Sequence, residues 1–165
     1  MVENTKKLSR AVADLSDEIN IDREIPEVLV NQMLEQGFFR LLVPKSVGGL
    51  EISYPDFLKI IFEIAKSDGS VGWCLNQNNV LGTLAAFMPR SLASTIWSNT
   101  KSVLSNGPPK LTKLCPAKGG YRLSGRWDFS SGIRHANWVV AVANLDEKFS
   151  LSGSGVMRHM VVPRP

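Results

Sequence analysis

Apolar residues recur at intervals of three and four along the first hundred positions, which is the period of an α-helix. One face of the first predicted helix carries Leu8, Val12, Leu15 and Ile19. Pro26 suits the start of a second helix, and Gly37 suits its end. The apolar run over residues 38–50 is broken by Pro44 and by Gly48 and Gly49. We therefore expect a buried connector with a tight turn there; the glycine pair lacks the spacing of a phosphate-binding loop.

Three more helices are predicted before residue 100. Pro55 opens a strongly periodic segment, residues 54–68, and Ser70 suits the N-cap of a helix over 70–88 that is apolar on nearly every side. Pro89 starts a short last helix. The expected core residues of the first of these helices are Phe57, Leu58, Ile61, Phe62 and Ile64.

The pattern changes after residue 100 to an alternation of apolar and polar residues, which predicts strands. The expected strands are residues 102–105, 111–115, 121–129, 137–144 and 156–162. Turn signals separate them at residues 106–107, 119–120 and the Ser/Gly-rich segment 150–155. The predicted class is α+β: an α-helical domain over residues 1–100, then an incomplete antiparallel β-domain over residues 101–165.

Composition is that of a soluble globular protein, with 44% apolar and 21% charged residues among 165. No segment has the length of a membrane span, and the first twenty residues are too charged for a signal peptide, so we expect a cytoplasmic protein. Cys74 and Cys115 lack metal-site spacing. Two reduced thiols are the favoured interpretation over a disulfide or a metal site, and no metal is expected.

Charge is distributed unevenly along the chain. Residues 1–100 carry nine Lys/Arg against twelve Asp/Glu, whereas residues 101–165 carry ten against three. The basic part suits a phosphate-bearing ligand or an ordinary solvated surface. Nucleic-acid binding is not expected, because the basic residues are scattered singly and accompany no nucleic-acid-binding module.

Two segments carry a family resemblance. Residues 37–73 resemble the N-terminal helical domain of acyl-CoA dehydrogenases and of the related two-component flavin hydroxylases. Their sequence is GFFRLLVPKSVGGLEISYPDFLKIIFEIAKSDGSVGW. Residues 119–143, GGYRLSGRWDFSSGIRHANWVVAVA, resemble the first strands of the middle β-domain of the same superfamily, where the flavin ring is held. Together they cover about two thirds of the chain in the expected order.

The resemblance implies a cofactor site for FAD or FMN at residues 129–132, FSSG. Ser131 falls on the position whose hydroxyl reaches the flavin N5 edge, and Phe129 on the position of an aromatic that packs on the ring. Ser130 and Gly132 complete this segment. The alternative is that Ser130 and Ser131 only begin a β-turn before Gly132, and it remains open at this point.

Other polar residues are candidates for a substrate pocket or a surface. Trp73, Asn76 and Asn79 lie on the helix that borders the substrate pocket in the hydroxylases, although core or interhelical hydrogen bonding explains the asparagines equally well. His135 is expected in an exposed turn with a surface role. No residue is assigned as catalytic.

The sequence GGYRLSGRWDFSSGIRHANW is more similar to the hydroxylase group than to the dehydrogenases. The resemblance implies an enzyme that takes reduced flavin from a separate reductase and transfers oxygen from O2 to a small-molecule substrate. No histidine stands between Trp73 and Pro89 to activate a phenol. The alternatives are an acyl-CoA dehydrogenase, which oxidises the CH–CH group of an acyl thioester with FAD, and a non-catalytic interaction module. Relatives of full length carry a C-terminal helical bundle, absent here, and form homotetramers. We therefore expect a fragment without turnover of its own.

Overall fold

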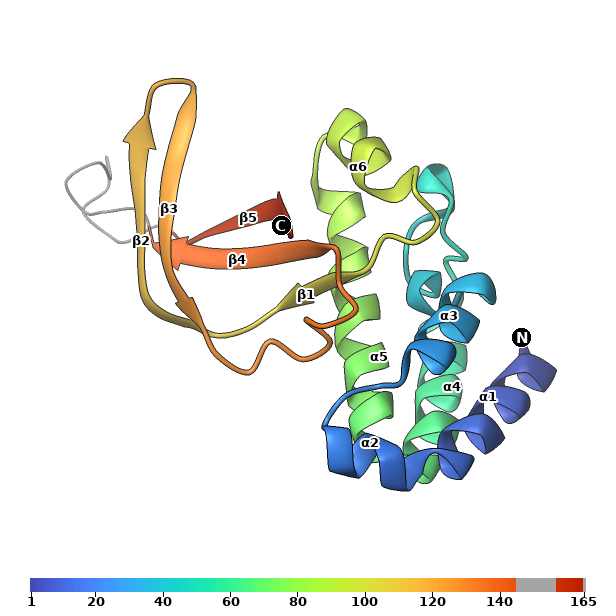
Figure 1. Cartoon of the computed structure of the whole chain (residues 1–165). Coiled ribbons are helices and arrows are strands. Elements are labelled where there is room, and N and C mark those ends of the chain that lie inside the picture. The colour runs from blue at the N-terminus through green and yellow to red at the C-terminus, as the bar shows by residue number, and fades with distance from the viewer. Residues whose placement is uncertain (145–156, 165) are drawn as a thin grey trace. The chain divides into compact units, whose positions relative to one another are not determined.

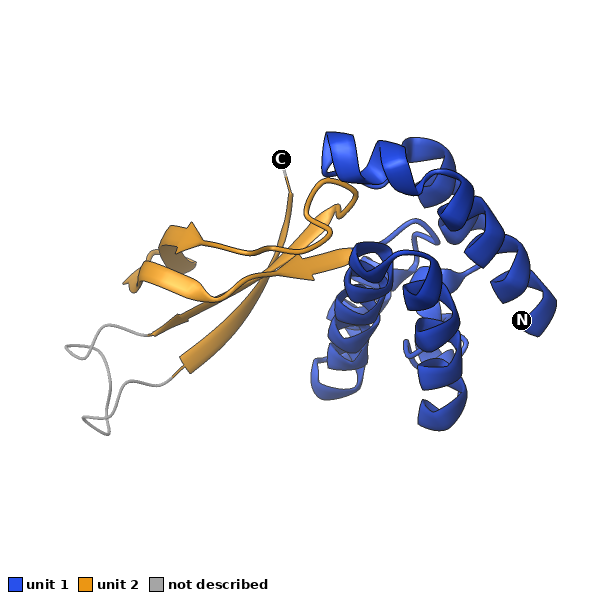
Figure 2. Ribbon diagram, turned by 90° about the horizontal axis from the view of Figure 1, so that it is seen from below, with its two compact units in different colours: residues 1–103 blue, residues 104–165 orange. Residues whose placement is uncertain are grey.

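A computed structural model describes residues 1–144 and 157–164. The chain divides into two compact units, Met1–Val103 and Leu104–Pro165, which Figure 2 colours separately. The sequence places this boundary after residue 100, three positions before the division seen here. The first unit is built from helices and the second from strands.

The helical unit contains six α-helices and three short 3-10 helices among its residues (Figure 1). They are α1 (Val2–Asp14), α2 (Ser16–Asp22), α3 (Glu27–Glu35), η1 (Phe38–Arg40), η2 (Lys45–Val47), α4 (Tyr54–Ser67), α5 (Gly69–Gly82), η3 (Thr83–Phe87) and α6 (Arg90–Trp97). Pro26 and Pro89 directly precede α3 and α6, as their restricted φ favours. The predicted helices are confirmed with two differences. A break at Leu15 separates α1 from α2, and the helix expected over residues 70–88 ends as α5 at Gly82 and is followed by the 3-10 helix η3.

The cap of α5 differs from the prediction. Asp68, not Ser70, is its N-cap, because one carboxylate oxygen of Asp68 accepts hydrogen bonds from the backbone N–H of Ser70 at 2.8 Å and of Val71 at 2.9 Å. Ser70 lies inside the first turn of the helix. A carboxylate that binds two unpaired N–H groups also interacts favourably with the positive end of the helix dipole.

Helix α4 lies against α1 and α5 at the centre of the helical unit. Leu8, Phe57 and Ile64 are fully buried in this core. Gly72 on α5 allows the two long helices to approach closely, because a Cβ atom at this position would lie 2.6 Å from the Cβ of Ala65 on α4. The apolar face of α4 that meets these neighbours supplies the hydrophobic stabilisation of the unit.

Fewer apolar side chains of α4 are buried than its periodicity predicted. Phe57 and Ile64 are buried, but Leu58 is 48% exposed and Phe62 is 68% exposed. The apolar stripe of this helix extends beyond the surface that α1 and α5 cover. Helical periodicity predicts which side chains share a face, whereas the width of the neighbouring helices decides how many of them are buried.

The connector between α3 and α4 forms the predicted tight turn. Gly48 adopts the left-handed conformation, with φ of 84°. Gly49 lies directly against the backbone, since a Cβ atom there would be 1.8 Å from the carbonyl oxygen of Val43. Both glycines are therefore required by the path of the chain.

Arg40 holds this turn in place from inside the protein. Its guanidinium is buried and donates to the carbonyl oxygens of Val47 and Gly48, each at 3.1 Å. It also donates to the carbonyl oxygens of Trp97, at 2.9 Å, and Asn99, at 3.0 Å, which links the connector to the C-terminal end of α6. Burial lowers the pKa of Arg40, yet the guanidinium remains the donor in all four hydrogen bonds.

The second unit contains five described strands in two sheets (Figure 1). They are β1 (Leu104–Asn106), β2 (Pro109–Ala117), β3 (Gly120–Trp127), β4 (Trp138–Asn144) and β5 (Met157–Pro163). One sheet has the order β1-β4-β5, and the other is the antiparallel hairpin of β2 and β3. Val140, Ala141 and Ala143 of β4 are buried.

The five predicted strands are confirmed, but one pairing differs from an entirely antiparallel arrangement. β4 pairs with β5 in antiparallel orientation and with β1 in parallel orientation. The hairpin of β2 and β3 lies between β1 and β4 in the chain and makes a connection long enough for parallel pairing. The turn predicted at residues 150–155 lies outside the described residues.

Candidate functional site

The segment that links β3 to β4 contains the residues predicted to bind flavin. β3 ends at Trp127, and Phe129 adopts a left-handed conformation with φ of 52°, which costs a non-glycine residue about 1–2 kcal/mol. The backbone N–H of Ser131 donates to the carbonyl oxygen of Phe129 at 2.8 Å, and that of Ile133 donates to the carbonyl oxygen of Ser130 at 3.1 Å. The segment is therefore a tight, strained turn rather than a continuation of β3.

The side chains of this turn differ in their exposure to solvent. Phe129 is 88% exposed, so its ring is available to an external partner. Ser130 and Ser131 are half-buried, and the Ser130 hydroxyl lies 3.3 Å from the carbonyl oxygen of Trp127, to which it donates. Gly132 has φ of 75°, a conformation that glycine adopts without strain. An exposed aromatic beside half-buried hydroxyls is consistent with one wall of a ring-binding site.

Asp128 anchors the first residue of the turn to the hairpin. Its carboxylate accepts a hydrogen bond from Nε of Arg126 at 2.5 Å and lies 3.7 Å from Nζ of Lys110. Arg126 and Lys110 are partners in the pairing of β3 with β2. Trp127 is tied in a similar way, since its indole N–H donates to the carbonyl oxygen of Val142 on β4 at 2.9 Å.

Two side chains that sequence reasoning missed contact the backbone of this segment. Ser105 on β1 donates to the carbonyl oxygen of Ser131, and Arg164, just after β5, donates to the carbonyl oxygens of Ile133, Arg134 and Ala136. Neither residue belongs to the two segments that carry the family resemblance. Only the fold brings them to the turn.

His135 is half-buried, which corrects the expectation of an exposed surface residue. Burial and, to a smaller extent, the positive charge of Arg164 lower the pKa of His135 to about 4. The imidazole is therefore neutral at neutral pH, with one nitrogen as donor and the other as acceptor.

Asn79 on α5 is fully buried, and its amide is hydrogen-bonded within the helical unit. Its oxygen accepts a hydrogen bond from the backbone N–H of Leu41 at 2.9 Å, and its nitrogen donates to the carbonyl oxygens of Phe38 at 2.8 Å and Leu75 at 2.9 Å. A further contact, from the backbone N–H of Leu42 at 3.4 Å, completes the set. These contacts occupy both donors and both acceptor positions of the amide, so none remains for a ligand.

Trp73 and Asn76 are less buried than Asn79 on the same helix. Trp73 is 54% exposed, and Asn76 is half-buried one turn further along the helix. Residues three apart lie on the same face of an α-helix. Trp73 and Asn76 are therefore neighbours on the surface of α5, whereas Asn79, three residues further on, is fully buried and is not part of that surface.

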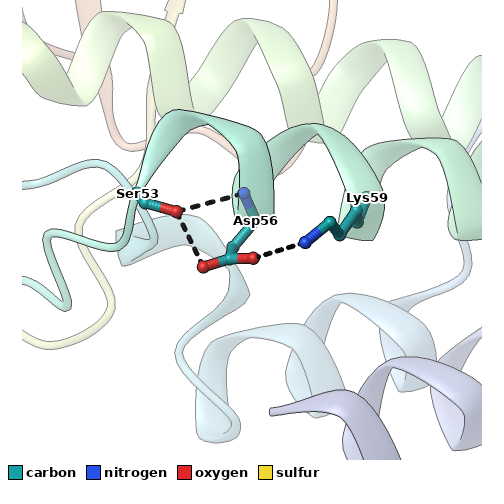
Figure 3. A network of polar contacts seen from close by, with 3 residues as sticks. All are labelled: Ser53, Asp56 and Lys59. Atoms are coloured by element: carbon teal, nitrogen blue, oxygen red, sulfur yellow. Dashed lines mark hydrogen bonds and ion pairs between the residues drawn. The ribbon is translucent and has the colours of Figure 1, made fainter.

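A groove of about 500 Å³ lies between α1 and α4 in the helical unit. Figure 3 shows the polar network at its edge, in which the carboxylate of Asp56 accepts from the hydroxyl of Ser53 at 2.7 Å and from Nζ of Lys59 at 2.9 Å. The hydrogen bond from Ser53, then the hydrogen bond and charge of Lys59, lower the pKa of Asp56. Its carboxylate is thus ionised at neutral pH and unsuited to act as a general acid.

The described ranges 1–144 and 157–164 offer neither a metal site nor a membrane span. These residues contain no group of three His, Cys, Asp or Glu side chains placed to hold a metal ion. Nor does any helix within them have both the length and the apolar character needed to cross a membrane.

Comparisons with known proteins point to flavin enzymes. Residues 3–89 match the family model "Acyl-CoA dehydrogenase, N-terminal domain". The chain is 32% identical to an indole-3-acetate monooxygenase of Pseudomonas putida over 74% of its own length and 31% of that protein. It is also 32% identical to the flavin-dependent monooxygenase oxygenase subunit HsaA of Rhodococcus jostii over 72% of its length and 31% of that subunit.

Among solved structures, the fold resembles that of XiaF from a Streptomyces species, determined in complex with FADH2 and glycerol. The TM-score is 0.87 at 26% identity, and the match covers 98% of this chain and 41% of XiaF. The chain thus spans about a third of the length of the two curated relatives and less than half of this solved one.

Proposed function

The chain belongs to the acyl-CoA dehydrogenase superfamily, and from that premise we propose that it is part of the oxygenase component of a two-component flavin monooxygenase. The relatives named above are monooxygenases, and one solved relative binds FADH2. The reaction proposed for the whole protein hydroxylates or otherwise oxygenates a small molecule. When bound, reduced FMN or FAD supplies two electrons to O2, so that one oxygen atom enters the substrate and the other leaves as water.

The observation that carries this proposal is the turn at residues 129–132. Phe129 presents an exposed ring, and Ser131 places a half-buried hydroxyl two residues further on. A hydroxyl is both donor and acceptor, so Ser131 suits the N5 edge of a flavin, which changes between acceptor and donor when the ring is reduced. Phe129 suits the ring face, where an apolar surface keeps water from the reacting atoms.

Within the helical unit, we propose Trp73 and Asn76 as residues that contact the substrate. An indole and an amide on one face of α5 offer an apolar surface with one polar group, which is the usual composition of a small-molecule pocket. Asn79 is left out of this proposal because its amide is already saturated. The substrate is not assigned beyond this class.

The proposed reaction requires a separate flavin reductase as partner, because the oxygenase receives its flavin in the reduced form. We place both proteins in the cytoplasm and infer that the whole oxygenase forms a homotetramer. Since the chain spans about a third of its relatives, we expect it to bind flavin weakly and to show no turnover by itself.

Flavin binding tests the proposal directly. We would titrate the chain with FMN and FAD, oxidised and reduced, and follow flavin fluorescence and visible absorbance. Weak binding is expected, and Ser131→Ala should weaken it by about fivefold to tenfold through loss of one hydrogen bond. Ser124→Ala, on the exposed strand β3 of the same unit, is the matched control and should leave binding unchanged.

Binding of neither flavin in either redox state would contradict the proposal. A bound flavin that is reduced by an acyl thioester would instead favour a dehydrogenase. Oxygenated product formed only when a flavin reductase supplies reduced flavin would support the monooxygenase.

A further inference from the structure

We propose that Ser105 and Arg164 are positioning residues that hold the flavin-facing turn from its two sides. The inference rests on the proposed function, because it concerns the same turn. Neither residue touches the cofactor in this proposal. Ser105 acts on the backbone of Ser131, and Arg164 acts on the backbone of residues 133–137, which directly follow the turn.

Ser105 provides the first of the two contacts. It is completely buried on β1, and its hydroxyl donates to the carbonyl oxygen of Ser131 at 2.9 Å. β1 is itself fixed by parallel pairing with β4, in which Ser105 is opposite Val139. The hydrogen bond therefore ties the peptide plane that follows Ser131 to a strand of the sheet and restrains the backbone from which the Ser131 side chain projects.

The end of β1 also sets how closely the turn approaches. A Cβ atom on Gly107 would lie 2.1 Å from the carbonyl oxygen of Asp128 and 2.5 Å from the hydroxyl oxygen of Ser130. The turn thus rests directly on the backbone at Gly107. Only glycine at this position lets the Ser105 hydroxyl reach Ser131.

Arg164 provides the second contact, at the far side of the segment. Its Nη1 lies 2.5 Å from the carbonyl oxygen of Ile133, 2.8 Å from that of Arg134 and 3.1 Å from that of Ala136. Its backbone N–H donates to the carbonyl oxygen of Asn137 at 2.9 Å. Hydrogen bonds from a charged donor are stronger than neutral ones, so one guanidinium gathers three carbonyl groups that point the same way.

The two contacts come from the two strands that flank β4. The sheet order is β1-β4-β5, and residues 133–137 connect the turn to β4. Ser105 lies on one neighbour of β4, and Arg164 follows the other. A strained backbone such as that of Phe129 persists only where its surroundings hold it. These two residues, far apart in sequence, supply that support.

Hydrogen exchange measures the positioning without a cofactor. In Ser105→Ala and Arg164→Gln we expect the amides of Ser131 and Ile133, both donors within the turn, to exchange about fivefold to tenfold faster. Ser105→Thr retains a hydroxyl and should restore slow exchange. The matched control is Ser9→Ala, which removes another buried serine that donates to a backbone carbonyl, that of Glu63, in the helical unit.

Flavin titration of the same variants separates positioning from mere stability. Ser105→Ala and Arg164→Gln should raise the Kd by a similar factor and alter the visible circular dichroism of the bound flavin, while Ser105→Thr should restore both. Ser9→Ala should change neither. Unfolding of the second unit in Ser105→Ala would be seen as fast amide exchange throughout β2 and β3. In that case, Arg164→Gln and Ser105→Thr test the positioning role.

The two proposals can fail separately. Faster exchange at the turn in a chain that binds no flavin would retain the positioning role and overturn the flavin function. Unchanged amide exchange at the turn in Ser105→Ala and Arg164→Gln, with the second unit still folded, would overturn the positioning role even if flavin binds. An equal effect of Ser9→Ala on the bound flavin would also overturn it.

Discussion

The hydroxyl of Ser105 and the carbonyl oxygen of Ser131 are joined by a 2.9 Å hydrogen bond across 26 positions of sequence. This contact links the first strand of the β unit to the turn that carries the proposed cofactor residues. Because the Ser105 side chain is completely buried, water cannot replace the hydrogen bond when it is removed.

Gly107→Ala should displace the turn. The added methyl group would lie 2.1 Å from the carbonyl oxygen of Asp128, and the backbone must shift to make room. We expect a loss of about 1–3 kcal/mol in the free energy of unfolding of the β unit, together with weaker flavin binding. Gly120→Ala is the control, because a Cβ atom there meets only open space. Equal stability of the two variants in urea denaturation would contradict this expectation.

Asn79→Ala should destabilise the helical unit. The substitution leaves the buried backbone N–H of Leu41 and carbonyl oxygen of Phe38 without their partner, at a cost of about 2–4 kcal/mol. Asn76→Ala, three residues earlier on the half-buried side, should cost less than about 0.5 kcal/mol. Thermal and urea unfolding of the two variants would check this difference.

Phe57→Ala and Phe62→Ala should differ strongly although both residues lie on α4. Phe57 is fully buried, so its truncation leaves a cavity and costs about 3–5 kcal/mol. Phe62 is 68% exposed, and we expect its truncation to cost less than about 1 kcal/mol. If Phe62→Ala were as destabilising as Phe57→Ala in urea, the exposed position of this ring would be wrong.

Acid should destabilise the β unit through His135. Its pKa is about 4 in the folded chain against about 6.5 in an unfolded one, so the unfolded state binds more protons between these values. Stability attributable to His135 is therefore complete above pH 6.5 and declines as the pH falls towards 4. His135→Gln should remove this part of the pH dependence of unfolding.

A second measurement separates the two causes of the low pKa. Arg164→Gln removes a positive charge and should raise the pKa of His135, as read from an NMR titration of the imidazole. The pKa should remain below its ordinary value, because burial is the larger cause. A return of the pKa to its ordinary value in Arg164→Gln would mean either that charge is the larger cause or that the substitution exposes the imidazole, and hydrogen exchange at the turn distinguishes the two.

Local pattern predicted the order and the type of the main helices and strands. Three- and four-residue spacing located the helices, alternation located the strands, and Pro26 and Pro89 marked helix starts, because each depends on residues close together in the chain. The motif around Ser131 likewise predicted the family, since the motif is contiguous. The glycine pair in the connector was predicted as a turn for the same reason.

Tertiary structure decided what depends on residues far apart. The width of α1 and α5 left Leu58 and Phe62 exposed, and the amide of Asn79 was taken up by a connector nearly forty residues away. Parallel pairing of β1 with β4 brought Ser105 to the turn, and the position of β5 brought Arg164. Spacing along a chain describes one element at a time, whereas burial and hydrogen bonding are set by whichever elements pack together.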